Sequence, residues 1–369
     1  MRIAIVHYWL VGMRGGEKVL ETLCRMYPTA DIFTHVYDPK LISGTIKLHK
    51  IQTTFINRLP FAKTMYKKYL PLMPMALEQI DLSGYDLIIS SESGPAKGIV
   101  PASDATHVCY CHSPMRYIWN MYNQYYDNSG IVTKAMMPPL AHYLRAWDFA
   151  TANRVDNFAA NSATVGKRIK SYYRRNSEII HPPVDTGSFG PVAAGDLGDH
   201  YLMVGELVKY KRPDLAVEAC NAMKAKLVVI GGGEMLDQLR KIAGPTVQIL
   251  GPQPFDVLQY HYARCKALIF PGEEDFGIVP VEAMASGRPV IAFGRGGATE
   301  TVVADKTGVF FTTQTTENII DAIERMARLD FNPDDAVSRA YEFRTEVFVD
   351  RFKSFIQSSL EGSSSMDHM

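Results

Sequence analysis

The sequence has 369 residues, of which 47% are hydrophobic and 21% are charged. At roughly 150 residues per domain, this length predicts two domains with their own cores, and the composition excludes disorder for most of the chain. The 39 Lys and Arg residues balance the 39 Asp and Glu residues, which excludes the basic surplus of a general nucleic-acid binder.

Short β-branched or aromatic runs alternate with helical patterns, which is typical of βαβ units and parallel sheets. In the first half we expect strands at 2–9, 31–37, 86–92, 107–112 and 157–162, and helices at 17–27, 138–156 and 164–174. In the second half we expect strands at 201–206, 226–231, 247–251, 267–271, 289–294 and 309–311, and helices at 213–223, 234–243, 255–265, 318–329, 335–343 and 348–360.

The segment 181–198 is rich in Pro and Gly and lacks hydrophobic periodicity, so it marks a domain boundary. The domains expected are an N-terminal one at 1–185, a C-terminal one at 186–340, a helix at 341–361 that can pack back on the N-terminal domain, and a flexible tail at 362–369. Two doubly wound sheets joined in this way would have the carboxyl ends of their strands, where such sheets bind ligands, available to face one another across a cleft.

Targeting signals are not evident in the sequence. Residues 1–11 are apolar, but they carry a single basic residue and no small-residue cleavage site, so we interpret them as a strand rather than a signal peptide. No apolar stretch approaches the ~20 residues that cross a bilayer. The five scattered cysteines do not form a disulfide framework and favour a reducing compartment.

The stretch 270–294, FPGEEDFGIVPVEAMASGRPVIAFG, predicts a strand, an acidic loop, a short helix and a further strand. Glu274 falls in the loop and Glu282 falls one turn into the helix. The backbone N–H groups of Gly277, Ile278 and Val279 form a seat for phosphate at the helix start. Carboxylates beside a phosphate would repel it unless they bind hydroxyl groups, so both glutamates suit a nucleotide sugar. The alternative is that both are solvated.

With Glu274 and Glu282 spaced as E-x7-E, this stretch resembles the signature of the retaining glycosyltransferases of family 4. That family has the GT-B fold, an α/β fold of two doubly wound Rossmann-like domains that face a central cleft. The stretch and the following GRGGATETV at 294–302 are similar to the bacterial mannosyltransferase branch, which builds O-antigen (lipopolysaccharide) and exopolysaccharide units from GDP-mannose. The resemblance covers nearly the whole chain. It implies that Glu274 contacts the donor sugar, that Glu282 holds the ribose, and that the amides of Phe276 to Val279 bind the diphosphate.

A basic turn follows the strand at 201–206. Lys211 in this turn resembles the family's diphosphate-binding lysine, and a cation there would neutralise the leaving nucleotide. The family usually has an arginine where this chain has Glu206, so a bidentate phosphate ligand is missing. Lys209 and Arg212 are candidate substitutes. The alternative is that Lys211 is a solvated turn residue.

In the first half, Gly12, Gly15 and Gly16 follow the first strand and allow backbone amides to approach a ligand. Their spacing is not G-x-G-x-x-G, which disfavours a dehydrogenase. The resemblance implies that this loop lies across the cleft from the donor diphosphate. His112, at a strand end, resembles the family's cleft histidine, which contacts the donor sugar; the alternative is a satisfied loop histidine. Arg116 is then a candidate for an acceptor or phosphate contact.

Metal ligands are not predicted. Cys109, Cys111 and His112 form a C-x-C-H run, but no second Cys/His pair follows at a useful spacing, so we expect buried strand cysteines rather than zinc. The sequence has no D-x-D motif, and the acidic residues 273–275 are more simply explained as solvated than as magnesium ligands. We therefore expect no metal and no cofactor beyond the nucleotide-sugar donor.

Residues 39–77 contain no Asp or Glu, whereas seven Lys and Arg residues alternate with apolar ones. Such a segment suits an anionic leaflet, where each basic residue contributes ~1 kcal/mol, and a polyprenyl-diphosphate-linked saccharide acceptor would sit there. The alternative is that the apolar side chains pack inside the first domain and the lysines are merely solvated. We expect a cytoplasmic protein that can be peripheral on the cytoplasmic face of the inner membrane.

Together these features predict an enzyme, a retaining glycosyltransferase that moves mannose from GDP-mannose to a lipid-linked oligosaccharide. In this mechanism the departing diphosphate takes the acceptor proton. The alternatives are a UDP-sugar-dependent transferase or nucleotide-sugar epimerase of the same fold, and a weakly active binding partner in a polysaccharide-assembly complex. A glycosidase built on the glutamate pair would need neither Lys211 nor a phosphate seat.

Overall fold

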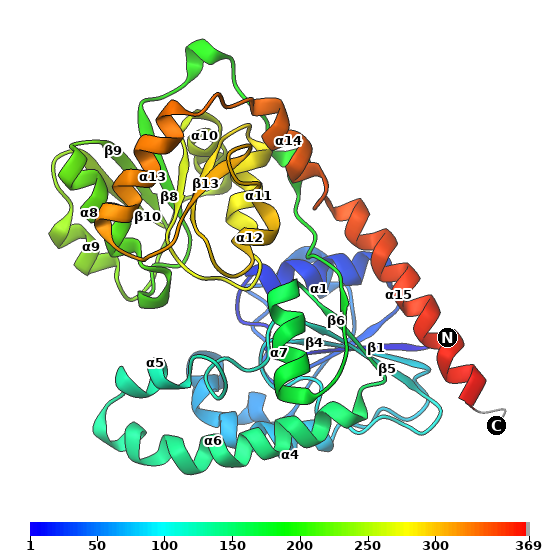
Figure 1. Cartoon of the computed structure of the whole chain (residues 1–369). Coiled ribbons are helices and arrows are strands. Elements are labelled where there is room, and N and C mark those ends of the chain that lie inside the picture. The colour runs from blue at the N-terminus through cyan, green and yellow to red at the C-terminus, as the bar shows by residue number, and fades with distance from the viewer. Residues whose placement is uncertain (367–369) are drawn as a thin grey trace. The chain divides into compact units, whose positions relative to one another are not determined.

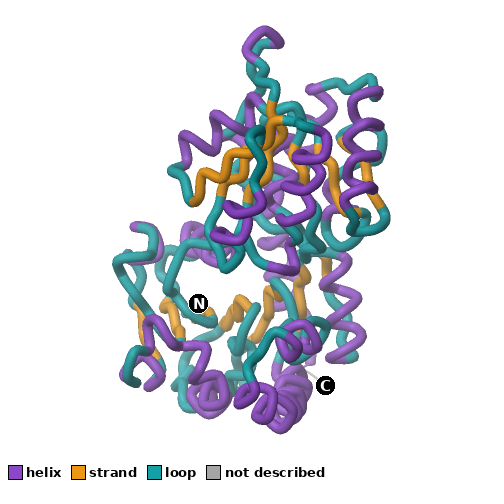
Figure 2. Tube along the Cα trace, turned by 90° about the vertical axis from the view of Figure 1, so that its left-hand side faces the viewer, coloured by secondary structure: helices purple, strands orange, loops and turns teal. Residues whose placement is uncertain are grey.

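The structure, a computed structural model, describes residues 1–366 of the chain. These residues form two compact α/β units. The first contains residues 1–181 and the chain from Val349 onward, and the second is Pro182–Phe348. Each unit has one parallel sheet with helices on both faces, as the two views in Figure 1 and Figure 2 show. The predicted architecture of two doubly wound, Rossmann-like sheets is confirmed.

The first sheet has seven strands. In spatial order these are β3 (Ile51–Thr53), β2 (Asp31–Thr34), β1 (Ile3–His7), β4 (Leu87–Glu92), β5 (Thr106–Cys111), β6 (Asn157–Ala160) and β7 (Glu178–Ile179). In the register, His7 of β1 pairs with Ser91 of β4, and Ser91 pairs with Tyr110 of β5. The carboxyl ends of these three central strands therefore lie side by side. The sequence analysis missed β3 and β7 because strands of three and two residues at the sheet edges carry no measurable periodicity.

The second sheet has six strands, all of them predicted. In spatial order these are β10 (Val247–Gly251), β9 (Lys226–Ile230), β8 (His200–Val204), β11 (Leu268–Phe270), β12 (Val290–Phe293) and β13 (Gly308–Phe311). Alternate residues of β9 pack in different hydrophobic cores. Leu227 and Val229 lie in one core, and Val228 and Ile230 lie in the other. A strand buried on both faces reads as a continuous apolar run, which is why these strands could be found from the sequence.

Helices cover both faces of each sheet. Those of the first unit are α1 (Gly15–Met26), α2 (Gly44–Lys47), α3 (Ala62–Met65), α4 (Met73–Glu78), α5 (Tyr122–Asp127), α6 (Ile131–Thr151) and α7 (Ala163–Tyr173). Those of the second unit are α8 (Pro213–Met223), α9 (Leu236–Ile242), α10 (Phe255–Arg264), α11 (Ile278–Ala285), α12 (Ala298–Thr301), α13 (Thr316–Arg328) and α14 (Pro333–Tyr341). Among the described residues, no helix is both long and apolar enough to cross a membrane.

Helix α6 begins at Ile131, whereas the sequence analysis placed its start at Pro138. Pro138 and Pro139 lie inside the helix, and both are exposed. Carbonyl groups one turn before a proline lose their helical donor, but on an exposed surface water can replace it. The prolines therefore do not end this helix, which Figure 1 shows as one continuous ribbon beside α5.

The last helix, α15 (Thr345–Met366), includes much of the predicted helix 341–361. Phe352 of α15 is buried, and its ring lies 6.0 Å from the ring of Tyr110 in β5. This contact packs the helix on the first unit. The helix also includes residues 362–366 of the predicted flexible tail 362–369, and residues 367–369 lie outside the described residues.

Candidate functional site

The predicted phosphate seat is the start of helix α11. Gly277 precedes the helix with φ of 86°, a left-handed conformation that favours glycine. Because Gly277 has no side chain, its position offers no capping group to the first backbone N–H groups of α11, which belong to Ile278 and Val279. These groups carry the positive end of the helix dipole. Phe276 anchors the turn in the core, since it is buried and its ring lies 5.5 Å from that of Phe343.

A glycine turn after β12 fixes the loop that carries Glu274. The Gly297 N–H group donates to the Glu274 carbonyl oxygen at 2.8 Å. A Cβ atom at Gly296 would lie 2.3 Å from that same oxygen, and one at Gly297 would lie 2.2 Å from Cα of Phe276. Both glycines are therefore required by close packing. The sequence analysis quoted this turn as part of the family resemblance but did not give it this role.

Lys211 and Glu274 form the central ion pair of the second unit. The Lys211 Nζ atom lies 2.8 Å from Oε1 of Glu274, and the two side chains are 15% and 21% exposed. Burial alone would lower the pKa of Lys211, but the Glu274 carboxylate outweighs it, so the pKa is raised. A Cβ atom at Gly272 would lie 2.7 Å from Cα of Lys211. The structure thus brings together two residues that were predicted separately.

Glu282 is held by a tyrosine that the sequence analysis missed. The hydroxyl of Tyr262, in α10, donates to Oε2 of Glu282 at 2.8 Å. Burial, followed by the Glu282 carboxylate, raises the pKa of Tyr262 well above its ordinary value. The hydroxyl therefore stays protonated and fixes one carboxylate oxygen. No local sequence signal identifies Tyr262, because its position depends on how α10 packs beside α11.

The residues around Glu206 have partners of their own. Glu206 is exposed, and its charge contributes to the raised pKa of Lys211. Of the two candidate substitutes for the missing arginine, Arg212 donates through Nη2 to Oδ2 of Asp214 at 2.9 Å. The side chain of Lys209 is exposed. Of the two candidates, Arg212 is therefore paired with a carboxylate, and Lys209 lies at the surface.

The predicted residues of the first unit lie at the carboxyl ends of the central strands. His112 follows β5, and its Nε2 atom lies 2.8 Å from Oγ of Ser91. Gly15 and Gly16 begin α1, and a Cβ atom at Gly16 would lie 2.2 Å from the Tyr8 hydroxyl. Arg116 points its Nη1 atom toward Sδ of Met121 at 3.8 Å. The structure thus places the predicted residues in two groups, one in each unit.

Cysteine and acidic residues do not cluster as metal ligands in the described part of the chain. No group of three or more His, Cys, Asp or Glu residues there is arranged to hold a metal ion. All five cysteines are free and buried. Burial raises the pKa of Cys109 and of Cys111 well above the ordinary value, so neither thiol ionises readily.

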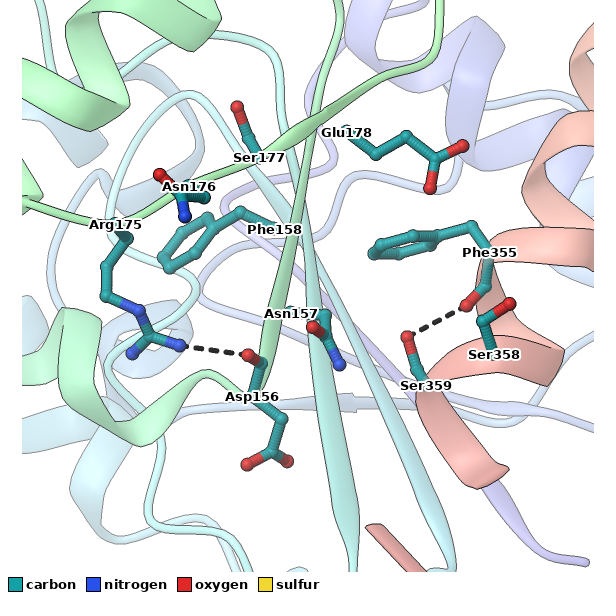
Figure 3. A pocket seen from close by; sticks show the side chains of 10 residues that line it. All are labelled: Asp156, Asn157, Phe158, Arg175, Asn176, Ser177, Glu178, Phe355, Ser358 and Ser359. Carbon is teal, nitrogen blue, oxygen red and sulfur yellow. Dashed lines mark hydrogen bonds between the residues drawn. The ribbon is translucent and has the colours of Figure 1, made fainter. Parts of the chain in front are cut away.

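A cavity of about 380 Å³ opens in the first unit, at the amino end of β6 and beside α15. It contains none of the predicted site residues. Two hydrogen bonds are made within its lining, as Figure 3 shows: an Arg175 N–H group donates to the Asp156 carbonyl at 2.9 Å, and the Ser359 hydroxyl donates to the Phe355 carbonyl at 2.8 Å. The cavity therefore lies apart from the predicted site.

The basic segment 39–77 divides between the core and the surface. Its seven Lys and Arg side chains are all exposed. Ile56, Tyr66 and Met73 pack in a buried cluster, whereas Leu48 is 86% exposed and Phe61 is 75% exposed. The alternative that apolar side chains pack inside the first unit is therefore confirmed for part of the segment, and the membrane interpretation stays a prediction.

Comparisons with known proteins match both units. The family model described as Glycosyltransferase Family 4 matches residues 13–188, and the model described as Glycosyl transferases group 1 matches residues 198–343. Together these two models cover most of the chain.

Among curated proteins, the GDP-mannose-dependent alpha-(1-6)-phosphatidylinositol monomannoside mannosyltransferase of Mycobacterium tuberculosis is 33% identical over 40% of this chain and 46% of its own. The D-inositol 3-phosphate glycosyltransferase 1 of Catenulispora acidiphila is 29% identical over 63% of this chain and 65% of its own. The chain thus spans about half to two thirds of the length of these relatives. Among solved structures, HepE of Anabaena in complex with UDP and glucose is 16% identical, with a TM-score of 0.70 over 97% of this chain and 100% of that one.

Proposed function

Because the chain belongs to glycosyltransferase family 4, we propose that it is a retaining enzyme that transfers mannose from GDP-mannose to a lipid-linked oligosaccharide. The observation that carries this proposal is the contact of Lys211, in the turn before α8, with Glu274, in the loop that leads into α11. A cation, a hydroxyl-binding carboxylate and free helix-start amides are the groups that a sugar diphosphate requires. The choice of GDP-mannose is supported by the mannosyltransferase of Mycobacterium tuberculosis, whose name specifies that donor.

In this mechanism Lys211 exchanges one anion for another. Without donor, Glu274 neutralises Lys211. An incoming diphosphate would bind Lys211 and the amides of Phe276, Gly277, Ile278 and Val279, and it would leave the Glu274 carboxylate to accept hydrogen bonds from sugar hydroxyls. As the glycosidic bond breaks, negative charge grows on the diphosphate, and Lys211 and the helix dipole stabilise it. That charge also allows the diphosphate to take the acceptor proton.

The remaining predicted residues hold the two ends of the donor. Glu282, fixed by Tyr262, would bind the ribose hydroxyls. His112 would contact the sugar, and the backbone of Gly15 and Gly16 would approach the diphosphate. Arg116 is the candidate contact for acceptor or phosphate. No metal is needed in this scheme, because Lys211 and the amides supply the positive charge.

The donor and the role of Glu274 can be tested together. Thermal shifts measured with GDP-mannose, UDP-glucose and UDP-N-acetylglucosamine should be largest for GDP-mannose. A larger shift with a UDP-sugar would mean that the donor is a UDP-sugar and not GDP-mannose. GDP release with an acceptor extract should fall roughly 100-fold or more in Glu274→Ala. The matched control is Glu273→Ala, which removes the neighbouring exposed carboxylate and should keep activity. Equal release by wild type and Glu274→Ala would overturn the assignment, and failure of every donor to bind would favour a binding partner in an assembly complex.

The acceptor is proposed to be polyprenyl-diphosphate-linked and to be met at an anionic membrane surface through residues 39–77. The support is that the basic side chains of this segment are exposed beside Leu48 and Phe61, which project apolar surface into solvent. Such a combination binds anionic leaflets peripherally. We further propose that this surface is the cytoplasmic face of the inner membrane.

Vesicle co-sedimentation tests the membrane proposal. Vesicles containing an anionic phospholipid should bind the protein, and the double variant Lys67→Glu/Lys68→Glu should bind roughly tenfold or more weakly. The control Lys167→Glu/Lys170→Glu reverses two exposed charges on α7 of the same unit and should bind like wild type. Equal binding to neutral and anionic vesicles, or equal losses in both variants, would contradict the proposal.

A further inference from the structure

A row of polar side chains leads from His112 into the core of the first unit. Nε2 of His112 lies 2.8 Å from Oγ of Ser91, and the same hydroxyl lies 3.0 Å from Nδ1 of His7. The other ring nitrogen of His7, Nε2, lies 3.8 Å from Oε1 of Glu17. The four residues come from the end of β5, from β4, from β1 and from the first turn of α1. The parallel register that pairs His7 with Ser91 creates this row.

The inner members of the row are shielded from water. Ser91, His7 and Glu17 are 0%, 1% and 2% exposed. Oε2 of Glu17 accepts the Arg14 N–H group at 3.0 Å, which fixes the orientation of the carboxylate. Nε2 of His7 has no hydrogen-bond partner, so the Glu17 oxygen is the charged group that decides whether a proton resides on this nitrogen. A bare nitrogen lone pair facing a buried carboxylate would be costly.

A serine hydroxyl has one proton, so it can donate to only one of the two histidines. If His7 carries its proton on Nε2, toward Glu17, then its Nδ1 atom is an acceptor and Ser91 must donate to it. The Ser91 oxygen then accepts from Nε2–H of His112, and Nδ1 of His112 is left without a proton. With a neutral His7, the opposite order would set the lone pair of its Nε2 atom against the Glu17 carboxylate.

We propose that Glu17, through His7 and Ser91, holds neutral His112 in the tautomer that is protonated on Nε2, so that Nδ1 is a hydrogen-bond acceptor. Glu17, His7 and Ser91 are then positioning residues for His112. Given the proposed function, on which this last step rests, the Nδ1 atom accepts a hydrogen bond from a donor-sugar hydroxyl. The tautomer itself does not depend on the proposed function.

The chain contains a matched control in the adjacent residue of the same strand. Oγ of Ser90 lies 2.9 Å from Nε2 of His107, and Nδ1 of His107 lies 2.7 Å from the Arg154 carbonyl oxygen. Ser90 and His107 are both buried, as Ser91 and His7 are. This pair leads to a backbone carbonyl and not to His112. Ser90→Ala therefore removes a buried serine–histidine contact of the same kind without touching the row.

Ring nitrogen shifts in the full-length protein labelled with ¹⁵N-histidine test the tautomer directly, with His112→Gln assigning the signal. Wild type should show His112 protonated on Nε2. In Glu17→Gln, the amide oxygen can keep the Arg14 bond while the amide nitrogen donates to Nε2 of His7. The hydrogen bonds from His7 to Ser91 and from Ser91 to His112 would then reverse direction, which should move the His112 proton to Nδ1. Ser90→Ala should leave the wild-type tautomer. A wild-type His112 protonated on Nδ1, or an unchanged tautomer in Glu17→Gln, would overturn the proposal.

If Glu17→Gln does not fold, Ser91→Ala supplies the same test, because removing the hydroxyl should leave His112 as a mixture of tautomers. In the transfer assay, Ser91→Ala should lower kcat roughly 10- to 100-fold with a smaller change in the donor KM, whereas Ser90→Ala should stay near wild type. An unchanged kcat in Ser91→Ala would refute the positioning role. Absence of transfer in the wild-type protein, with the expected tautomer present, would refute the proposed function alone.

Discussion

Each unit of the molecule has a lysine in contact with carboxylates, and the two clusters differ in burial. In the first unit, Lys97 lies 3.0 Å from Oε1 of Glu92 and also contacts Asp148, with all three side chains at 0–1% exposure. Asp148 further accepts from Trp119 Nε1 at 2.7 Å and from the Tyr173 hydroxyl at 2.9 Å. In the second unit, the side chains of Lys211 and Glu274 are 15% and 21% exposed, so this pair keeps partial access to solvent.

This difference separates a structural cluster from one that can bind a ligand. Removing a charge from water costs several kcal/mol per ion. A member of a buried cluster therefore cannot exchange its partner without leaving an unpaired charge in the core. At the partly exposed Lys211–Glu274 pair, solvent lowers that cost, so a competing anion could replace Glu274 as the partner of Lys211. We therefore expect changes at Lys97 to affect folding and changes at Lys211 to affect transfer.

The largest effect is expected for Lys97→Met. This variant keeps the side-chain length but leaves Glu92 and Asp148 together in the core without a counter-charge. The free energy of unfolding should fall by about 3–5 kcal/mol, measured by denaturant titration. The control Lys226→Met removes an exposed Lys–Asp pair with a 2.7 Å contact and should change little. A Lys97→Met protein as stable as wild type would mean that burial does not distinguish the two clusters.

Lys211→Met tests the same comparison from the other side. GDP release should fall roughly 100- to 1,000-fold because the leaving diphosphate loses its cation. The free energy of unfolding should fall by about 1–2 kcal/mol, less than in Lys97→Met, because the partly exposed Glu274 carboxylate can still be solvated. A large loss of stability with normal turnover would place Lys211 with Lys97 as a structural residue. Activity and denaturant titrations on one preparation decide between these outcomes.

The two clusters also differ in how far they could be predicted from the sequence. Glu274, Glu282 and the start of α11 lie within one short stretch, so a local pattern predicted the loop and the helix, and the resemblance to a family suggested roles for both glutamates. The bond from Lys97 to Asp148 joins residues 51 apart, and the contact of His7 with Ser91 joins residues 84 apart. Such contacts depend on strand order and register, which no local pattern encodes. The sequence therefore predicted the sheets and the strand, loop and helix that carry Glu274 and Glu282, but not the polar core of the first unit.

The buried cluster should also respond to pH. Burial, with the Asp148 charge adding to it, raises the pKa of Glu92 to about 7 although Lys97 opposes the shift. Between its ordinary pKa and about 7, the folded protein therefore holds a proton that the unfolded chain releases. The free energy of unfolding should therefore fall as pH rises through this window. Above it, Glu92 should no longer make the free energy of unfolding depend on pH.

Glu92→Gln should flatten this dependence, because glutamine mimics the protonated carboxyl and leaves Lys97 balanced by Asp148. Denaturant titrations from pH 4.5 to 8 measure the slope. If wild type becomes more stable as pH rises toward 7, or if Glu92→Gln keeps the wild-type slope, Glu92 is ionised in the folded protein at lower pH. The Lys97 and Lys211 clusters would then differ only in their solvent exposure.

The smallest effect is expected at Glu206, an exposed carboxylate whose charge acts on the partly exposed Lys211–Glu274 pair. Glu206 adds to the raised pKa of Lys211, and it would repel a diphosphate bound there. Glu206→Arg should tighten donor binding by about 1 kcal/mol, roughly fivefold, as expected for an exposed charge. Because solvent screens this interaction, the gain should shrink between low and physiological salt, whereas the contacts of the buried Lys97 cluster should not respond to salt. Donor dissociation constants at two ionic strengths test this, and an unchanged affinity at low salt would show that Glu206 does not face the bound anion.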